Sequence, residues 1–213
     1  MKYIDMETWK RKNQYEMFKE MEMPHFNICS NVDVKEFKEF CKREKLSFFK
    51  CMLYLVSRVV NEIPELRTRI RKEGIVQYDH VNPSFTILGD DELFGFARAE
   101  HTDNFKTFYS RVEKGIEKVK NNVTPDFDAD MDSDFYLTTI PWISFTSIQH
   151  PMHIKQGDCI PRIALGKYFE DQGRLMMPVA LQAHHGLADG VHAGKFYMKM
   201  EKYLKTPSEY LGR

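Results

Sequence analysis

One segment of the chain reads Gln182-Ala183-His184-His185-Gly186-Leu187-Ala188-Asp189-Gly190-Val191-His192. It follows a β-type run over 174–184 and precedes a helical pattern from about Asp189 to Leu204, so we expect a turn between strand and helix. Because adjacent strand residues point to opposite faces, only one of His184 and His185 can face a given cleft. A histidine for proton transfer, beside Asp189 to order the turn and Gly190 to give it conformational freedom, fits general-base catalysis.

The composition of the whole chain excludes several classes of protein. The 213 residues carry 31 Lys+Arg and 31 Asp+Glu, which leaves no basic field for nucleic acid or for a membrane surface. The longest apolar stretch, over 48–60, is interrupted by Lys50, Ser57 and Arg58 and is too short to span a membrane. The four cysteines are scattered without CxxC spacing, and the amino-terminal residues do not resemble a secretory signal. We therefore expect a cytoplasmic protein with reduced thiols.

Helical and strand patterns alternate along the rest of the chain. Helices are predicted from Asp5 or Thr8 to about Phe18, from Asp33 through Cys41, over 47–63 and over about 104–120. Strands are predicted over 25–32, 75–78, 84–88, 93–98, 135–140 and 162–169, the three between 75 and 98 forming a meander, with a tight turn at Asp171-Gln172-Gly173. No linker divides the chain, so residues 1–213 are expected to form one domain. The mixed order predicts an α+β fold, a two-layer sandwich in which helices pack on a mixed sheet.

Other segments point to a known family. These are Thr8-Trp9-Lys10-Arg11, Asn61-Glu62-Ile63-Pro64-Glu65-Leu66-Arg67, Asn82-Pro83-Ser84-Phe85-Thr86 and Ile140-Pro141-Trp142. In this order, and together with the HHxxxDGxH pattern of 184–192, they resemble the chloramphenicol acetyltransferases, one family of CoA-dependent acyltransferases. The resemblance covers nearly the whole chain. It implies the CoA-dependent acyltransferase fold and a homotrimer with active sites at subunit interfaces.

The resemblance also implies roles for individual residues. His185, the second histidine of the pair, matches the general base that deprotonates an acceptor hydroxyl in a ternary complex with the co-substrate acetyl-CoA, without an acyl-enzyme. Asp189 matches a carboxylate that pairs with the arginine after the amino-terminal Trp, here Arg11, and ties the turn to the first helix. Thr138 occupies the position of a hydroxyl, usually Ser, that stabilises the tetrahedral intermediate; a Thr hydroxyl can donate the same hydrogen bond. Trp142 and Tyr168 match aromatic residues near the CoA arm and adenine.

The acceptor pocket departs from the family pattern. Phe18 and Phe26 keep aromatic walls, but Ala164 replaces a Thr that holds a water near the intermediate. Where drug-binding members are largely apolar, this chain has four other residues: Glu22, His150, Met152 and Arg162. A buried arginine is costly unless it is paired. Either an exposed pocket rim or a polar acceptor with an anionic group is therefore predicted, and chloramphenicol is expected to be a poor acceptor.

Two alternative functions remain open. A dihydrolipoamide acyltransferase-like enzyme would have a thiol acceptor, although its motif usually begins Asp-His. A trimeric binding protein could keep the fold without turnover if Thr138 and Ala164 no longer support the intermediate. The alternating aspartates over 126–134 lack the Gly and Glu of a calcium loop and are interpreted as a solvated acidic loop. No metal is expected.

Overall fold

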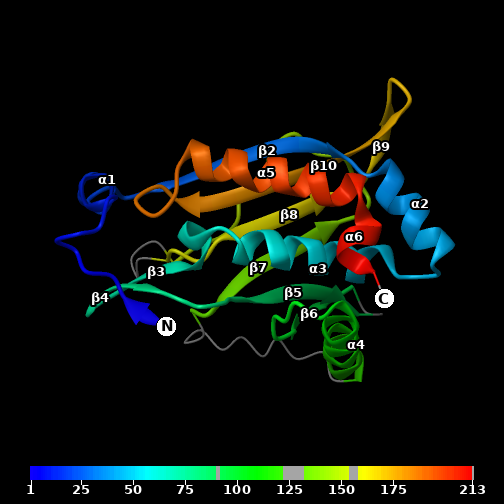
Figure 1. Cartoon of the computed structure of the whole chain (residues 1–213), viewed down its shortest axis with the longest axis horizontal. Coiled ribbons are helices and arrows are strands. Elements are labelled where there is room, and N and C mark those ends of the chain that lie inside the picture. The colour runs from blue at the N-terminus through cyan, green and yellow to red at the C-terminus, as the bar shows by residue number, and fades with distance from the viewer. Residues whose placement is uncertain (90–91, 122–131, 154–157, 213) are drawn as a thin grey trace.

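The computed structural model describes residues 1–89, 92–121, 132–153 and 158–212, which form a mixed sheet and packed helices (Figure 1). The helices are α1 (Lys12–Phe18), α2 (Lys35–Arg43), α3 (Phe48–Asn61), the 3-10 helix η1 (Pro64–Arg67), α4 (Phe105–Asn121), α5 (Gly190–Lys205) and α6 (Pro207–Leu211). The strands are β1 (Lys2–Tyr3), β2 (His25–Asp33), β3 (Thr68–Arg71), β4 (Gly74–Gln77), β5 (Asn82–Leu88), β6 (Phe94–Arg98), β7 (Asp134–Ile140), β8 (Arg162–Gly166), β9 (Phe169–Asp171) and β10 (Arg174–His184).

The main sheet of the described residues has seven strands, in the order β2-β10-β8-β7-β5-β6 with β9 paired to β10. β10 pairs antiparallel with β2 and β8, whereas β7 pairs in parallel with β5 and β8. Gln172 and Gly173 form the two-residue turn before β10, with φ of 49° and 77° as such hairpin turns require. The mixed sheet confirms the predicted α+β architecture.

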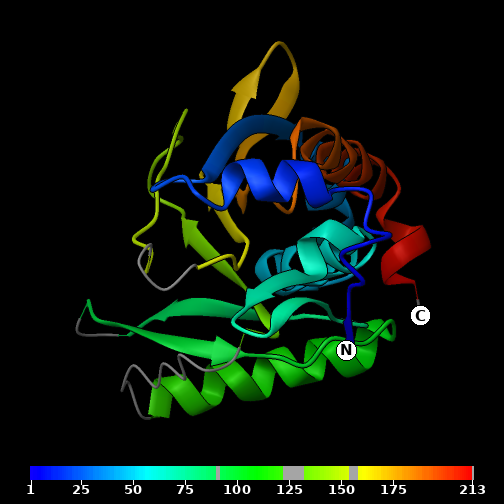
Figure 2. The ribbon, with the colours of Figure 1, turned by 90° about the vertical axis from the view of Figure 1, so that its left-hand side faces the viewer.

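The two faces of this sheet differ. Side chains alternate along a strand, so Leu137 of β7, Ile163 of β8 and Leu181 of β10 share one face, where they join the main hydrophobic core. Helices α3 and α5 cover this face, as the side view shows (Figure 2). The even-numbered residues of the same strands, among them Thr138 and Gln182, point to the opposite face. We call this the open face; the segment after β7 lies on its side of the sheet (Figure 2).

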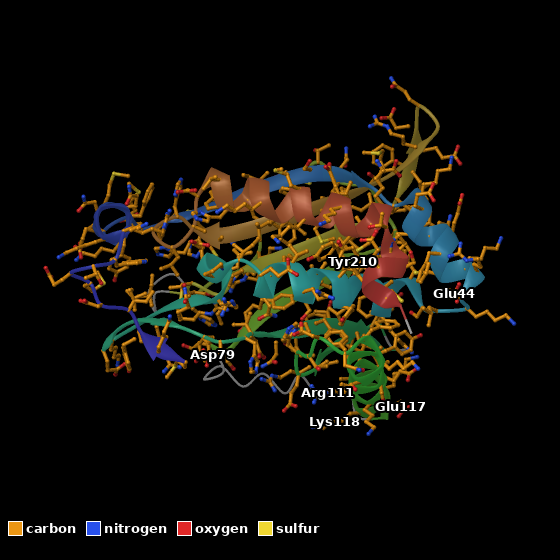
Figure 3. The ribbon with its side chains drawn as sticks, in the orientation of Figure 1. Glu44, Asp79, Arg111, Glu117, Lys118 and Tyr210 are labelled. Carbon is orange, nitrogen blue, oxygen red and sulfur yellow. The ribbon has the colours of Figure 1, made fainter. Side chains whose placement is uncertain are left out.

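Local sequence explains where the covering helices begin. The Ser47 hydroxyl accepts from the Lys50 N–H and caps α3, which buries nine of its side chains. Asp189 caps α5 in the same way by accepting from the Val191 N–H. α4 packs on β6 and β5, and its exposed side, with Arg111, Glu117 and Lys118, points outward (Figure 3).

Several sequence predictions were wrong in detail. The predicted meander does not form, because β4 pairs with β1 and β3 in a separate three-stranded sheet of the described residues. The first helix begins at Lys12, since Asp5 and Thr8 instead close a turn through the Glu7 N–H and the Thr8 hydroxyl. The strand predicted over 162–169 is two strands, separated where the Lys167 N–H donates to the Ile143 carbonyl.

The acidic segment is only partly described, because residues 126–131 lie outside the described ranges. Asp132 accepts hydrogen bonds from Arg71, and Asp134 from Arg98. The Asp134 side chain is only 5% exposed. For these two aspartates the interpretation as a solvated loop was wrong, since each carboxylate is paired with an arginine.

Candidate active site

The turn after β10 is held from both sides. The His185 N–H donates to the Pro24 carbonyl at 2.6 Å, which ties the turn to the segment before β2. The His184 carbonyl accepts from both Leu187 and Ala188 at 3.0 Å. The turn that carries the predicted base is therefore fixed by its own backbone and by the neighbouring strand.

His185 is held by two aromatic rings. Its imidazole stacks on Phe18 of α1, with centroids 4.0 Å apart and planes 6° apart, and meets the edge of Phe26 of β2 at 5.0 Å. Its Nδ1 is buried and has no hydrogen-bond partner among the described residues. Phe18 and Phe26, which were predicted as acceptor walls, orient this ring in the structure.

His184 points into the protein, as expected for a structural histidine. It is 4% exposed, packs edge-on against His25 and accepts from the Gly186 N–H through Nδ1 at 3.1 Å. Burial, followed by the nearby imidazoles of His25 and His185, lowers the pKa of His184 to about 4. A neutral His184 thus supports the turn from inside.

Arg11 and Asp189 form the predicted ion pair, with Nη1 2.6 Å from Oδ2. The Arg11 Nη2 also donates to the His185 carbonyl at 3.3 Å. Although burial opposes ionisation, the Arg11 hydrogen bond, the nearby His192 imidazole and the charge of Arg11 lower the pKa of Asp189. His192 completes a capping box, since its Nδ1 accepts from the Asp189 N–H. This explains a histidine of the pattern to which sequence reasoning gave no role.

The turn contains two glycines, and the expectation for Gly190 was wrong. Gly190 does not have a positive φ, and a Cβ there would meet nothing within 4 Å, so its conformational freedom is not used. At Gly186, a Cβ would lie 3.1 Å from the His184 ring and 3.3 Å from the Tyr15 Cα. Gly186 is thus the position where the close approach of α1 and the turn requires a small residue.

A cavity of about 380 Å³ opens on the open face of the sheet. Its lining comes from four strands and the segment after β7: Ser84, Thr86, Phe94, Phe96, Tyr136, Leu137, Thr138, His150, Pro151, Met152, His153, Arg162 and Ile163. The Thr138 hydroxyl lies 3.0 Å from that of Thr86. Ala164, fully buried, is the β8 partner of Thr138. Thr138 and Ala164 are therefore neighbours across β7 and β8, and Arg162, His150 and Met152 line the same cavity as Thr138, whereas Glu22 is absent from the lining.

Arg162 is not on an exposed rim. Its side chain and that of Asp158 are each 8% exposed, and the two form an ion pair in which Nη1 lies 3.1 Å from Oδ1. The guanidinium also lies over the Tyr136 ring, 5.3 Å from its centroid. Sequence reasoning missed Asp158, and the i, i+4 spacing to an arginine was the signal available. The rim alternative is wrong because this pairing offsets the desolvation of Arg162.

The segment after β7 is attached to the open face by side chains. The Asn27 amide donates to the Ile148 carbonyl at 2.6 Å. Gln182 accepts from the His150 N–H and donates to the Met152 sulfur. Asn27 and Gln182 thus place one wall of the cavity.

The two residues predicted for CoA are accessible. Trp142 is 64% exposed just after β7, and Tyr168 is 37% exposed between β8 and β9. The Lys38 ammonium of α2 lies 4.3 Å from the Tyr168 ring centroid.

Within the described ranges, no cluster of His, Cys, Asp and Glu has the arrangement of a metal site. No described helix is long and apolar enough to cross a membrane.

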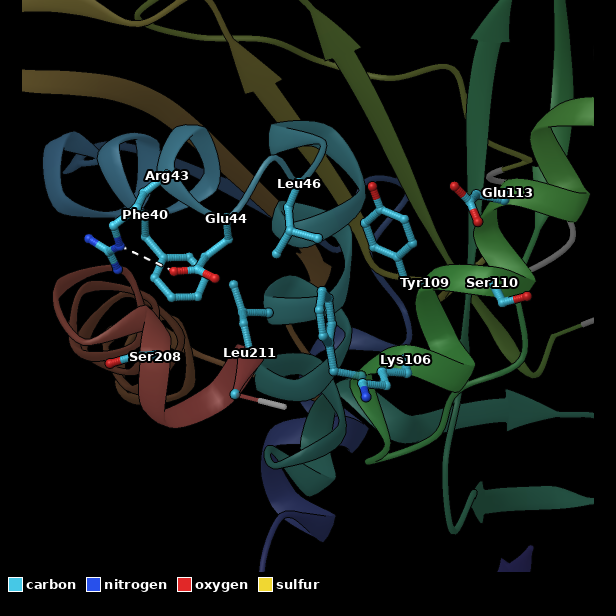
Figure 4. A pocket seen from close by; sticks show the side chains of 12 residues that line it. Phe40, Arg43, Glu44, Leu46, Lys106, Tyr109, Ser110, Glu113, Ser208 and Leu211 are labelled. Atoms are coloured by element: carbon cyan, nitrogen blue, oxygen red, sulfur yellow. Dashed lines mark hydrogen bonds and ion pairs between the residues drawn. The ribbon is translucent and has the colours of Figure 1, made fainter.

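The predicted residues thus form two groups within one chain. Arg11, Asp189, Phe18 and Phe26 surround His185. Thr138 and Arg162 line the cavity, with the buried Ala164 beside Thr138, and the lining does not include His185. A separate cavity of about 480 Å³ lies between α2, α4 and α6, with Phe40, Leu46 and Leu211 among its lining (Figure 4). None of the predicted site residues lines that cavity.

Comparisons with known proteins identify the family of this chain. A family model described as chloramphenicol acetyltransferase matches residues 1–201. A chloramphenicol acetyltransferase of Clostridium butyricum is 28% identical over 212 residues, covering 98% of this chain and 96% of the relative. One from Klebsiella sp is 25% identical over 201 residues, covering 94% and 92%.

Solved structures show the same fold. A chloramphenicol acetyltransferase superposes with a TM-score of 0.84 at 31% identity, covering 96% of this chain and 99% of the other. A dihydrolipoamide acetyltransferase of Azotobacter vinelandii gives a TM-score of 0.73 at 16% identity, covering 93% and 88%. The second likeness concerns the fold alone. The chain is an acyltransferase that belongs to the chloramphenicol acetyltransferase family, whose co-substrate is acetyl-CoA.

Proposed function

We propose that residues 1–213 act as one domain that transfers an acetyl group from acetyl-CoA to the hydroxyl of a small acceptor. The observation that carries this proposal is the His185 ring, clamped between Phe18 and Phe26 on a turn that Arg11 and Asp189 hold in place. Since Nδ1 is buried, an acceptor meets Nε2. A base with a fixed ring loses little orientational freedom in the transition state.

The reaction follows from these positions. His185 takes the hydroxyl proton as the oxygen attacks the thioester carbon; the C–S bond then breaks, and the proton passes from His185 to the departing CoA thiolate. Thr138 donates a hydrogen bond to the developing oxyanion. Trp142 and Tyr168 contact CoA, and Phe18, Phe26, Arg162 and Ala164 surround the acceptor. Arg11 and Asp189 act through the turn rather than on substrate.

The separation of His185 from the Thr138 cavity supports a site shared between subunits of a homotrimer. Each active site would then combine the base of one subunit with the cavity of the next. In this arrangement the interface is heterologous and closes into a ring. A single subunit would bind acceptor weakly and would not turn over.

Mixing two inactive variants tests the shared site. We expect His185→Ala and Thr138→Val to be strongly impaired alone, measured as thiol release from acetyl-CoA with an acceptor panel. After denaturation and refolding of an equal mixture, about a quarter of the sites should contain both intact residues and recover activity. No recovery, with trimers present by light scattering, would place both residues in one subunit. Transfer to dihydrolipoamide alone, or no thiol release by wild-type protein, would instead support the thiol-acceptor enzyme or the inactive binding protein.

A further inference from the structure

The guanidinium of Arg162 is only partly used within the protein. Nη1 donates to Asp158 Oδ1 at 3.1 Å and to the Ile160 carbonyl at 3.0 Å, and Nη2 donates to Asp158 Oδ2. Of the five N–H groups, this leaves Nε–H and the second Nη2–H, which lie side by side on one edge of the planar group. Among the described residues no partner occupies this edge, and Nε is not among the buried unpaired atoms. Within the part of the chain that the structure describes, this edge is therefore open to a ligand.

The cavity that Arg162 lines has polar and apolar walls. Ser84, Thr86 and Thr138 supply hydroxyls, while aromatic rings and Met152 supply apolar walls. No aspartate or glutamate lines it within the described ranges. Burial, and then the charge of Arg162, lowers the pKa of His150, so this imidazole adds no charge near neutral pH. A cationic acceptor would find no counter-ion here, whereas two parallel N–H donors match a carboxylate.

We propose that the acceptor is a hydroxy acid: an alcohol with an apolar body, whose carboxylate binds the open edge of Arg162 while its hydroxyl is acetylated. This inference rests on the proposed function, since it names the acceptor of that reaction. The hydroxyl oxygen forms the new bond to the acetyl carbon and its proton passes through His185 to the CoA thiolate. The carboxylate is unchanged. The cavity of about 380 Å³ lies within the range of small-molecule sites.

The Asp158 ion pair prepares Arg162 for this role. Asp158 also accepts from the backbone N–H of Ile160 at 3.2 Å and of His153 at 3.4 Å, so a second carboxylate does not displace it. Held by Asp158 at its end and by Tyr136 on its face, the guanidinium keeps its side edge in one orientation. An arginine fixed in this way loses little side-chain entropy when a ligand binds.

Three acceptors of one shape test the inference. They are 4-(hydroxymethyl)benzoate, the neutral 4-(hydroxymethyl)benzamide and the cationic 4-(aminomethyl)benzyl alcohol. By calorimetry, wild-type protein should bind the benzoate roughly ten- to a hundredfold more tightly than the benzamide, and the amine most weakly. Arg162→Lys keeps the charge but loses the paired donors, so most of this preference should disappear. Arg174→Lys, the same change at an arginine side chain that is 54% exposed, is the matched control and should keep it.

The outcomes separate this inference from the proposed function. Equal affinity of wild-type protein for benzoate and benzamide, or no binding of either, would overturn the hydroxy-acid assignment; this comparison needs no variant and holds even if Arg162→Lys does not fold. Thiol release from acetyl-CoA with the same compounds tests acetyl transfer separately. Transfer without preference for the acid would leave the proposed function standing. A preference in binding with no transfer to any acceptor would contradict the proposed function instead.

Discussion

Arg11 Nη1 lies 2.6 Å from Asp189 Oδ2, although 178 positions separate the two residues in the chain. Their side chains are 14% and 32% exposed. The pair therefore connects the segment before α1 to the cap of α5 across the turn that carries His185. Since Arg11 also reaches the His185 carbonyl, one guanidinium contacts both ends of that turn.

Removing this ion pair should reduce stability and rate together. We expect Arg11→Val or Asp189→Asn to cost about 2 kcal/mol, less than a fully buried pair because Asp189 is partly exposed. A double-mutant cycle by denaturant unfolding should give a clear coupling energy. Additive losses in the free energy of unfolding would show that the two side chains do not stabilise each other.

The same pair predicts a pH dependence. The pKa of Asp189 in the folded protein lies below its ordinary value of 3.8, so its contribution is present above that pH and is lost as pH falls through the lower folded pKa. The stability difference between wild type and Asp189→Asn should therefore shrink below about pH 4. A difference that stays constant down to the acid transition would contradict this.

The two adjacent histidines should separate into a catalytic and a structural role. His185→Ala should lower kcat by about 10²- to 10⁴-fold with a modest change in stability, because it removes the base. His184→Ala should cost about 1–3 kcal/mol of stability, since it leaves the Gly186 N–H without its acceptor in a buried site. Both variants are compared by kinetics and thermal melting. The reverse pattern would indicate that His184 is the base.

Gly186 should tolerate no side chain. An added Cβ would lie 3.1 Å from the His184 ring and 3.3 Å from the Tyr15 backbone, so Gly186→Ala should shift the turn and cost about 1–3 kcal/mol together with activity. Gly194→Ala is the control at an exposed position of α5, where a Cβ meets nothing within 4 Å and alanine should stabilise the helix slightly. Equal effects at both positions would show that the turn can adapt.

Chloramphenicol should be a poor but detectable acceptor, because its ring would lie against the Arg162 and Asp158 pair. Arg162→Val alone leaves Asp158 unpaired and should destabilise the protein by roughly 3–5 kcal/mol. The double variant with Asp158→Asn removes both charges and should raise kcat/KM for chloramphenicol selectively, whereas Ala164→Thr should raise turnover for all acceptors. If the wild-type protein acetylated chloramphenicol efficiently and the double variant did so equally well, the Arg162 and Asp158 pair would not determine acceptor specificity.

Strong local patterns were sufficient for part of the structure. β10 was predicted with its observed bounds because a largely apolar run follows a turn whose Gly173 suits a positive φ. β3 (Thr68–Arg71) was missed because every second residue in it is an arginine, so it contains no apolar run. Arg69 is fully buried and donates to backbone carbonyls, a partnership that no sequence pattern reveals. The Arg11 and Asp189 pair came from family resemblance, since no local rule joins residues so far apart. The separation of His185 from Thr138 depends on tertiary geometry and was beyond sequence reasoning.

Because side chains alternate between the two faces of the sheet, different positions of a strand serve the core and the cavity. In β5, β6, β7 and β8 odd-numbered side chains such as Phe85, Ala97 and Leu165 join the core, while even-numbered ones such as Thr86, Phe96 and Arg162 line the cavity. A mutational library confined to even positions would therefore explore new acceptors while leaving core packing intact. Parity along four strands is thus a guide for anyone wishing to redirect this enzyme.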